Sequence, residues 1–84
     1  MLKDLSIVIP TYNRQQYALR NIHYWSNRGP EVHVLDGSAV PVRDELLSSV
    51  GPNIHYHHWP ISMISRISKV REVLTTPYTA LMGD

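Results

Sequence analysis

Polar side chains of complementary types gather in two short segments and recur at the last residue of the chain. Residues 10–14 supply a hydroxyl, an amide and a guanidinium, residues 36–38 supply a carboxylate and a hydroxyl, and Asp84 adds a second carboxylate. Carboxylates and amides bind base edges and ribose hydroxyls, whereas a guanidinium binds phosphate. The inventory therefore favours a nucleotide-like ligand. The candidate binding residues are Pro10, Thr11, Tyr12, Asn13, Arg14, Asp36, Gly37 and Ser38.

The two segments follow apolar runs that are typical of strands. Residues 5–9 form a near-continuous apolar run, which indicates a strand covered on both faces, as parallel strands are. Residues 31–36 form a second strand, and residues 53–57 form a third, whose polar character places it nearer an edge. Residues 78–82 read as a fourth, buried strand. The candidate residues therefore lie where strands end.

Helical periodicity separates these strands. Asn13 followed three residues later by Gln16 resembles an N-cap pair and predicts a first helix that ends at residues 27–30. Residues 41–50 predict a short amphipathic helix, and residues 61–74 predict a third helix. The apolar stripes are Ala18, Ile22 and Trp25 in the first helix, Val42, Leu46 and Val50 in the second, and Met63, Ile67, Val70 and Leu74 in the third.

The resulting order is β-α-β-α-β-α-β, which predicts an α/β fold with right-handed crossovers and a parallel sheet in one partial domain, residues 1–84. Ligands of such sheets bind outside the carboxyl ends of the strands, near the point where the strand order reverses. No glycine-rich phosphate loop is present in the sequence. A divalent cation held by Asp84 would therefore neutralise a diphosphate, with Mg²⁺ as the natural choice.

Length and charge exclude several other classes. The chain has 84 residues, no cysteine, and a net charge of +1 from eight basic and seven acidic side chains, which disfavours a disulfide scaffold and a nucleic-acid partner. Its first residues do not resemble a signal peptide. No run approaches the roughly 20 apolar residues that span a bilayer. A cytoplasmic location is therefore expected.

Two segments together resemble the beginning of a GT-A-type, family 2 glycosyltransferase. Residues 7–14 match the family's V-[IV]-[IV]-P-[ST]-[YF]-N strand and loop, and residues 34–38 resemble its D-D-G-S turn. The resemblance implies the nucleotide-sugar-binding half of a Rossmann-like GT-A fold, with Thr11 and Asp36 as the best donor contacts. It also implies that Asp84 is part of an interrupted D-x-D motif for Mg²⁺ or Mn²⁺.

The same resemblance implies the reaction. A sugar would pass with inversion from a nucleotide-diphosphate-sugar donor to the hydroxyl of a glycan, lipid or protein acceptor. The catalytic base and the acceptor-binding half are expected to lie outside this chain, which would bind donor but be inactive alone.

The sequence departs from the family pattern at two places. Leu35 stands where the family often has the first Asp of its pair, which is expected to relax selectivity for the base or ribose. The third helix lacks the family's Ala-Arg-Asn segment, and Arg66 is the nearest basic replacement and a candidate donor contact. The helical pattern itself assigns Arg66, with Lys69 and Arg71, to a solvated face.

Other interpretations remain open beside this one. The chain could be a stand-alone nucleotide-binding α/β module, or a nucleotidyltransferase-like or flavodoxin-like domain that shares the topology. His55 and His57 on one strand could suggest a metal site, but they lack a second ligand pair, and an edge strand explains them without a metal. Trp59 is expected to be a packed loop anchor. Exposed apolar faces and an unpaired strand edge also predict self-association of the chain.

Overall fold

The computed structural model describes residues 5–74 and 78–82. Four parallel strands in the order β3-β2-β1-β4 and three helices form an α/β fold, which confirms the predicted class and element order. The elements are β1 (Leu5–Thr11), α1 (Gln15–Trp25), β2 (Glu31–Asp36), α2 (Asp44–Leu47), β3 (Ile54–His58), α3 (Met63–Val70) and β4 (Tyr78–Leu81).

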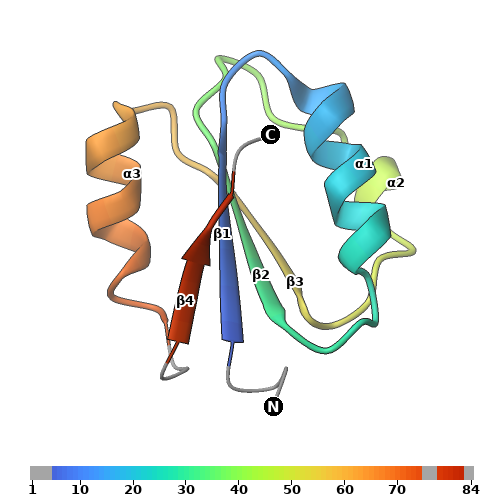
Figure 1. Cartoon of the computed structure of the whole chain (residues 1–84). Helices are drawn as coiled ribbons and strands as arrows, with labels where there is room; N and C mark the ends of the chain where they lie inside the picture. Colours follow the sequence, from blue (N-terminus) through green and yellow to red (C-terminus); the bar gives the residue numbers. More distant parts are fainter. Residues whose placement is uncertain (1–4, 75–77, 83–84) are drawn as a thin grey trace.

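The helices cover the two faces of the sheet unequally. Helices α1 and α2 lie on one face and α3 lies on the other (Figure 1). The chain steps outward from β1 to β2 and β3, and then returns to place β4 on the far side of β1. The strand order therefore reverses between β1 and β4. In an open parallel sheet this reversal opens a crevice at the carboxyl edge, where ligands bind.

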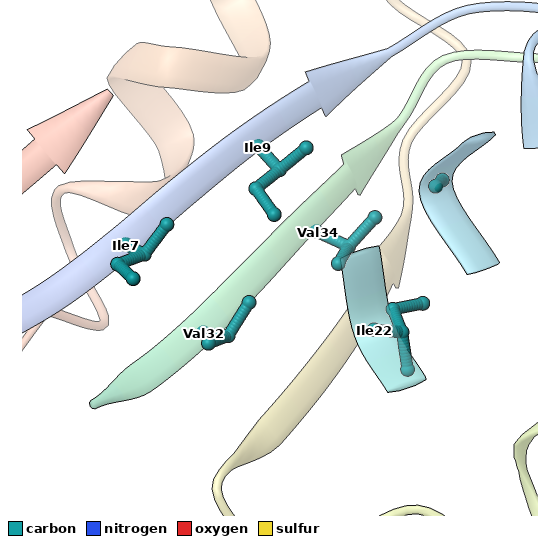
Figure 2. Close-up of a cluster of buried hydrophobic side chains, with 6 residues drawn as sticks. Ile7, Ile9, Ile22, Val32 and Val34 are labelled. Atoms are coloured by element: carbon teal, nitrogen blue, oxygen red, sulfur yellow. The ribbon is translucent and has the colours of Figure 1, made fainter. Parts of the chain in front are cut away.

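Apolar side chains fill both sides of the two central strands. Between the sheet and α1 lies the larger core, in which Ile22 of the helix packs on the side chains of β1 and β2 (Figure 2). A smaller core lies under α3, where Val70 meets Val8 and Leu35. Because both faces are covered, β1 and β2 have near-continuous apolar sequences. The buried members of the larger core are Ile7, Ile9, Ala18, Ile22, Val32 and Val34, and Trp25 is half-buried against them.

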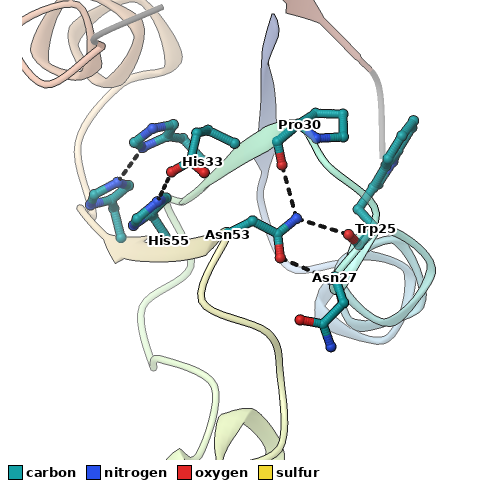
Figure 3. A network of polar contacts seen from close by, with 8 residues as sticks. Trp25, Asn27, Pro30, His33, Asn53 and His55 are labelled. Atoms are coloured by element: carbon teal, nitrogen blue, oxygen red, sulfur yellow. Dashed lines mark hydrogen bonds and ion pairs between the residues drawn. The ribbon is translucent and has the colours of Figure 1, made fainter. Parts of the chain in front are cut away.

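Asn53 joins three segments at the amino edge of the sheet (Figure 3). Its side-chain amide donates hydrogen bonds to the carbonyls of Trp25 and Pro30, at 2.9 and 2.8 Å, and its side-chain oxygen accepts one from the N–H of Asn27 at 2.9 Å. Asn53 is buried, so these bonds satisfy polar groups that water does not reach. The end of α1 and the start of β3 are thereby fixed to each other.

Two helices are shorter than their sequence patterns predict. The helix expected over residues 41–50 forms only at α2, because the N–H of Val42 donates to the hydroxyl of Tyr56 and Arg43 is extended. The helix expected over residues 61–74 forms only at α3, and hydrogen bonds with a three-residue spacing close the turn after it. In both segments, the apolar periodicity of the sequence therefore continues past the residues that form the helix.

Burial also corrects two expectations. Met63, predicted on the buried stripe of the third helix, is 53% exposed. The fourth strand was expected to be buried, but the side chains of Tyr78, Thr79 and Leu81 are exposed because β4 is an outer strand of the sheet. The prediction that β3 lies at an edge is confirmed.

Candidate functional site

The two predicted binding segments meet at the carboxyl edge of β1 and β2. Thr11 and Asp36 are opposite each other in the parallel register. The N–H of Gly37 donates to the carbonyl of Thr11 at 2.9 Å, and the N–H of Asn13 donates to the hydroxyl of Ser38 at 2.7 Å. The loop after β1 and the loop between β2 and α2, residues 37–43, therefore form one surface.

Asp36 lies beneath this surface and is fully buried. One carboxylate oxygen accepts the N–H of Ser38 at 2.9 Å, and the other accepts the Gln15 amide at 2.8 Å and the Tyr56 hydroxyl at 2.5 Å. Burial alone would raise the pKa of Asp36, but the hydrogen bonds from Ser38, Tyr56 and Gln15 outweigh it and hold the pKa below its usual value. Asp36 is thus a buried anion that organises the loops around it.

Two partners of Asp36, Gln15 and Tyr56, are not among the residues that the sequence predicts for the site. Gln15 also donates to the carbonyl of Val40 at 2.6 Å, so it links the first turn of α1 to the β2–α2 loop. Tyr56 arrives from β3, where burial and then the bond to Asp36 raise its pKa. The signal for Tyr56 was the two-residue alternation of β3, which puts it on the same face as Asp36 once parallel register is assumed.

The beginning of α1 differs from the predicted N-cap. Asn13 has a left-handed backbone, with φ at 55°, and Arg14 occupies the N-cap position without a side-chain capping bond. The carbonyl of Arg14 accepts the N–H groups of Tyr17 and Ala18. The predicted pairing of Asn13 with Gln16 is therefore wrong, because the N–H of Asn13 is directed to Ser38 instead.

Arg66 is the largest departure from the predicted surface. The helical pattern predicts a solvated face for it, but Arg66 is only 4% exposed. The guanidinium lies against Gly37, and Nη1 donates to the carbonyl of Ile61 at 2.7 Å. Nε has no hydrogen-bond partner, and among residues 5–74 and 78–82 no carboxylate forms an ion pair with this cation.

Two clefts open at this edge, and Arg14 borders both. A cleft of about 530 Å³ lies between α1 and the β2–α2 loop, and a cleft of about 210 Å³ lies between the end of β1 and the start of α3. The larger is lined by Asn13, Arg14, Gln15, Gln16, Tyr17, Ser38, Ala39 and Val40. The smaller is lined by Pro10, Thr11, Tyr12, Arg14, Met63 and Arg66.

The predicted residues have different surroundings at these clefts. Thr11 is buried at the end of β1, whereas Tyr12 is 62% exposed at the mouth of the smaller cleft. The Arg14 side chain is exposed, with its guanidinium 4.8 Å from the ring centre of Tyr17. Asp84, the proposed metal ligand, lies outside the described residues. Within the described ranges, no three acidic or imidazole side chains are grouped to hold a metal ion.

Comparisons with known proteins add no relative. No protein-family model, curated protein or solved structure matches the chain. In the part of the chain that is described, no helix has the length and apolar character needed to cross a membrane. The α/β fold rests on the arrangement of strands and helices alone, and the resemblance to family 2 glycosyltransferases stays a prediction.

Proposed function

We propose that the carboxyl edge of this sheet binds the nucleoside diphosphate part of a nucleotide-sugar, as the donor-binding half of a glycosyltransferase would. The observation that carries the proposal is Arg66, a buried cation in the smaller cleft with an unsatisfied Nε and without a paired carboxylate among the described residues. Burying a charge is costly unless an opposite charge compensates it. An anionic ligand would supply that compensation.

Phosphate is a suitable anion for this cleft. The planar guanidinium presents several donors that match phosphate oxygens in a fork-like arrangement. The cleft lies at the end of β1 beside the reversal of strand order, where nucleotides bind in open parallel sheets. Arg14 connects it to the larger cleft, so one ligand can extend from one into the other.

The larger cleft suits the nucleoside. Its volume of about 530 Å³ falls within the range of small-molecule sites. The side-chain amides of Asn13 and Gln16 and the amide oxygen of Gln15 offer donors and acceptors to a base edge and a ribose, whereas the side-chain N–H groups of Gln15 already donate to Asp36 and Val40. Asp36 would act mainly through Gln15 and Ser38, because both of its oxygens are already occupied.

In the proposed reaction, an acceptor hydroxyl attacks the anomeric carbon of the sugar, the bond from that carbon to the diphosphate breaks, and the configuration inverts. Arg66 would stabilise the negative charge that develops on the departing diphosphate. The proton of the hydroxyl needs a general base. No residue of this chain is assigned to that role, so the described residues support donor binding as their share of the reaction.

The test compares Arg66→Met with Arg71→Met, which removes an exposed arginine directly after the last residue of α3. Titrations with uridine diphosphate and guanosine diphosphate, with and without Mn²⁺, should show affinity falling roughly 10- to 100-fold in Arg66→Met only. Urea denaturation should show that Arg66→Met is at least as stable as wild type, because the buried cation that it removes has no ion pair in the described part of the chain. Equal nucleotide affinity in wild type and Arg66→Met would refute the proposal.

A further inference from the structure

Strand β3 directs alternate side chains to the two faces of the sheet, and both sets contact β2 or the loop that follows it. On the face of α1, the Tyr56 hydroxyl donates to Asp36 at 2.5 Å and accepts the N–H of Val42 at 2.9 Å. His58 donates from Nε2 to the carbonyl of Ser38 at 2.7 Å. Tyr56 and His58 therefore hold the β2–α2 loop that lines the larger cleft.

On the opposite face, β3 is joined to β2 by histidines. Nδ1 of His33 and Nε2 of His57 lie 3.0 Å apart and form a hydrogen bond. The ring of His55 stacks on that of His33 with 4.7 Å between centres, and Nε2 of His55 lies 2.6 Å from a carboxylate oxygen of Glu31 (Figure 3). We call His33, His55 and His57 the histidine cluster.

The number of protons on the histidine cluster decides whether the hydrogen bond between His33 and His57 can form. One nitrogen of the His33–His57 bond must donate and the other must accept. The bond survives one added proton but not two, because both nitrogens would then be donors. His33 is 6% exposed, so water does little to screen the repulsion between charged rings stacked at this distance.

We propose that β3 is a pH-sensitive latch on the β2–α2 loop: a neutral histidine cluster keeps β3 closed on β2, and protonation of the cluster releases β3 and with it Tyr56 and His58. Only the effect on nucleotide binding rests on the proposed function above. The cluster is the one set of stacked imidazoles among the described residues.

Charged groups around the histidine cluster favour or oppose its protonation. Glu31 on β2 favours protonation, whereas Lys69 of α3, whose amino group lies 5.1 Å from the ring centre of Trp59, adds positive charge on this face. Trp59 in turn stacks on His57 at 4.5 Å. Strand β1 contributes no titratable side chain, because its residues are Leu, Ser, Ile, Val, Ile, Pro and Thr.

The sign of the pH dependence follows from the pKa values. Burial, then the charges of His55 and His57, lower the pKa of His33 from 6.5 to about 4, and burial also lowers the pKa of His57. The latched state therefore binds fewer protons than the released state. Latching is fully favoured above about pH 6.5 and is lost as the pH falls toward about 4. Asp36 stays ionised over most of this range because its own pKa is lowered.

Amide hydrogen exchange of the 84-residue chain without ligand tests the latch. Two amides report on it, the N–H of Trp59 bonded to the Asp36 carbonyl and the N–H of Gly37 bonded to the Thr11 carbonyl. The N–H of Ser26, bonded to Ile22 at the end of α1, is the internal control. Between about pH 7 and pH 4, protection of Trp59 and Gly37 should fall about tenfold more than that of Ser26. An equal loss at all three amides would mean global unfolding and would overturn the proposal.

Substitutions of histidines test whether the histidine cluster causes the loss of amide protection at low pH. The double variant His33→Asn with His57→Gln keeps neutral hydrogen-bonding side chains and should abolish the differential loss of protection. His23→Gln changes an exposed histidine of α1 and should leave the loss as in wild type. If the double variant does not fold, the imidazole titration of wild type by NMR decides the question. The His33 and His57 midpoints must coincide with the loss of protection, and separate midpoints would overturn the latch.

A further experiment measures nucleotide affinity, and its outcome depends on the proposed function. Uridine diphosphate titrates near pH 6 itself, so the informative quantity is the affinity of each variant relative to wild type at the same pH. As the pH falls from about 7 to about 4, nucleotide affinity should decrease about tenfold more in wild type and in His23→Gln than in the double variant. Absence of nucleotide binding at every pH would refute the proposed function, while the exchange experiment would still decide whether the latch exists.

Discussion

Gly37 and Arg66 compete for the same volume beside the end of β2. A Cβ atom added to Gly37 would lie 1.6 Å from Nη1 of Arg66, a separation that forces the guanidinium to move. The sequence suggests glycine here because Asp-Gly favours turns. The structure adds a second reason, which is room for a buried cation.

We expect Gly37→Ala to cost about 1–3 kcal/mol of unfolding free energy in wild type, because the displaced guanidinium disrupts its own packing. In an Arg66→Ala background the same change should cost less than about 0.5 kcal/mol. Urea denaturation of the four proteins in this double-mutant cycle gives the coupling. Additive effects would show that the two residues do not share this volume.

Sequence patterns located the meeting of residues 10–14 with residues 36–38, because both segments follow strands of one parallel sheet. They did not locate Tyr56 as a partner of Asp36, or the burial of Arg66. The first depends on the register between β2 and β3, and the second on how α3 docks over Gly37. Tertiary packing decides both, and local periodicity does not encode it.

The start of α3 positions Arg66. Ser62 is the N-cap, and its hydroxyl accepts the N–H of Ser65 at 3.2 Å. Arg66 follows within the first turn, and its own N–H donates to the carbonyl of Ser62 at 2.9 Å. The cap therefore fixes the part of the helix that directs the guanidinium into the smaller cleft.

Ser62→Ala should lower the free energy of unfolding by about 1 kcal/mol, because the first turn loses its capping acceptor. Ser68→Ala, at an exposed position inside the same helix, should be neutral or slightly stabilising because alanine is the better helix former. Chemical denaturation monitored by circular dichroism measures both. Equal destabilisation by the two changes would contradict a capping role for Ser62.

The order of elements could be predicted, but their ends could not. Apolar periodicity of 3.6 residues continues through residues 41–50, although Val42 gives its N–H to Tyr56 and only α2 is helical. The pattern predicts burial of its apolar positions, of which Val42 is buried and Leu46 is 39% exposed. It does not record where the backbone hydrogen bonds go, and those bonds define a helix.

Strand β4 presents an outer edge of the sheet with exposed apolar side chains. Tyr78 is 68% exposed and Leu81 is 63% exposed. Strand edges with apolar surroundings pair with other chains unless charges or covering segments prevent it. We therefore expect the predicted self-association to occur at this edge.

We expect light scattering to show a mass that rises with concentration for wild type and less so for Leu81→Lys, because a charge opposes edge pairing. Ile64→Lys, which changes an apolar residue on the outer side of α3 that is 77% exposed, is the matched control and should associate as wild type does. A monodisperse wild-type monomer at all concentrations would contradict the prediction. If both variants reduced association equally, β4 would not be the specific site of contact.

The partners of Asp36 have a consequence for the order in which the chain is made. Gln15, Ser38 and Tyr56 all precede Arg66 in sequence, so a ribosome releases the complete set of donors around the buried anion before it releases the cation. Synthesis adds about 5–20 residues per second, so Tyr56 is made roughly a second before Arg66. The nascent chain can therefore assemble the acidic centre first, and the Arg66 guanidinium is then buried against a scaffold that already exists.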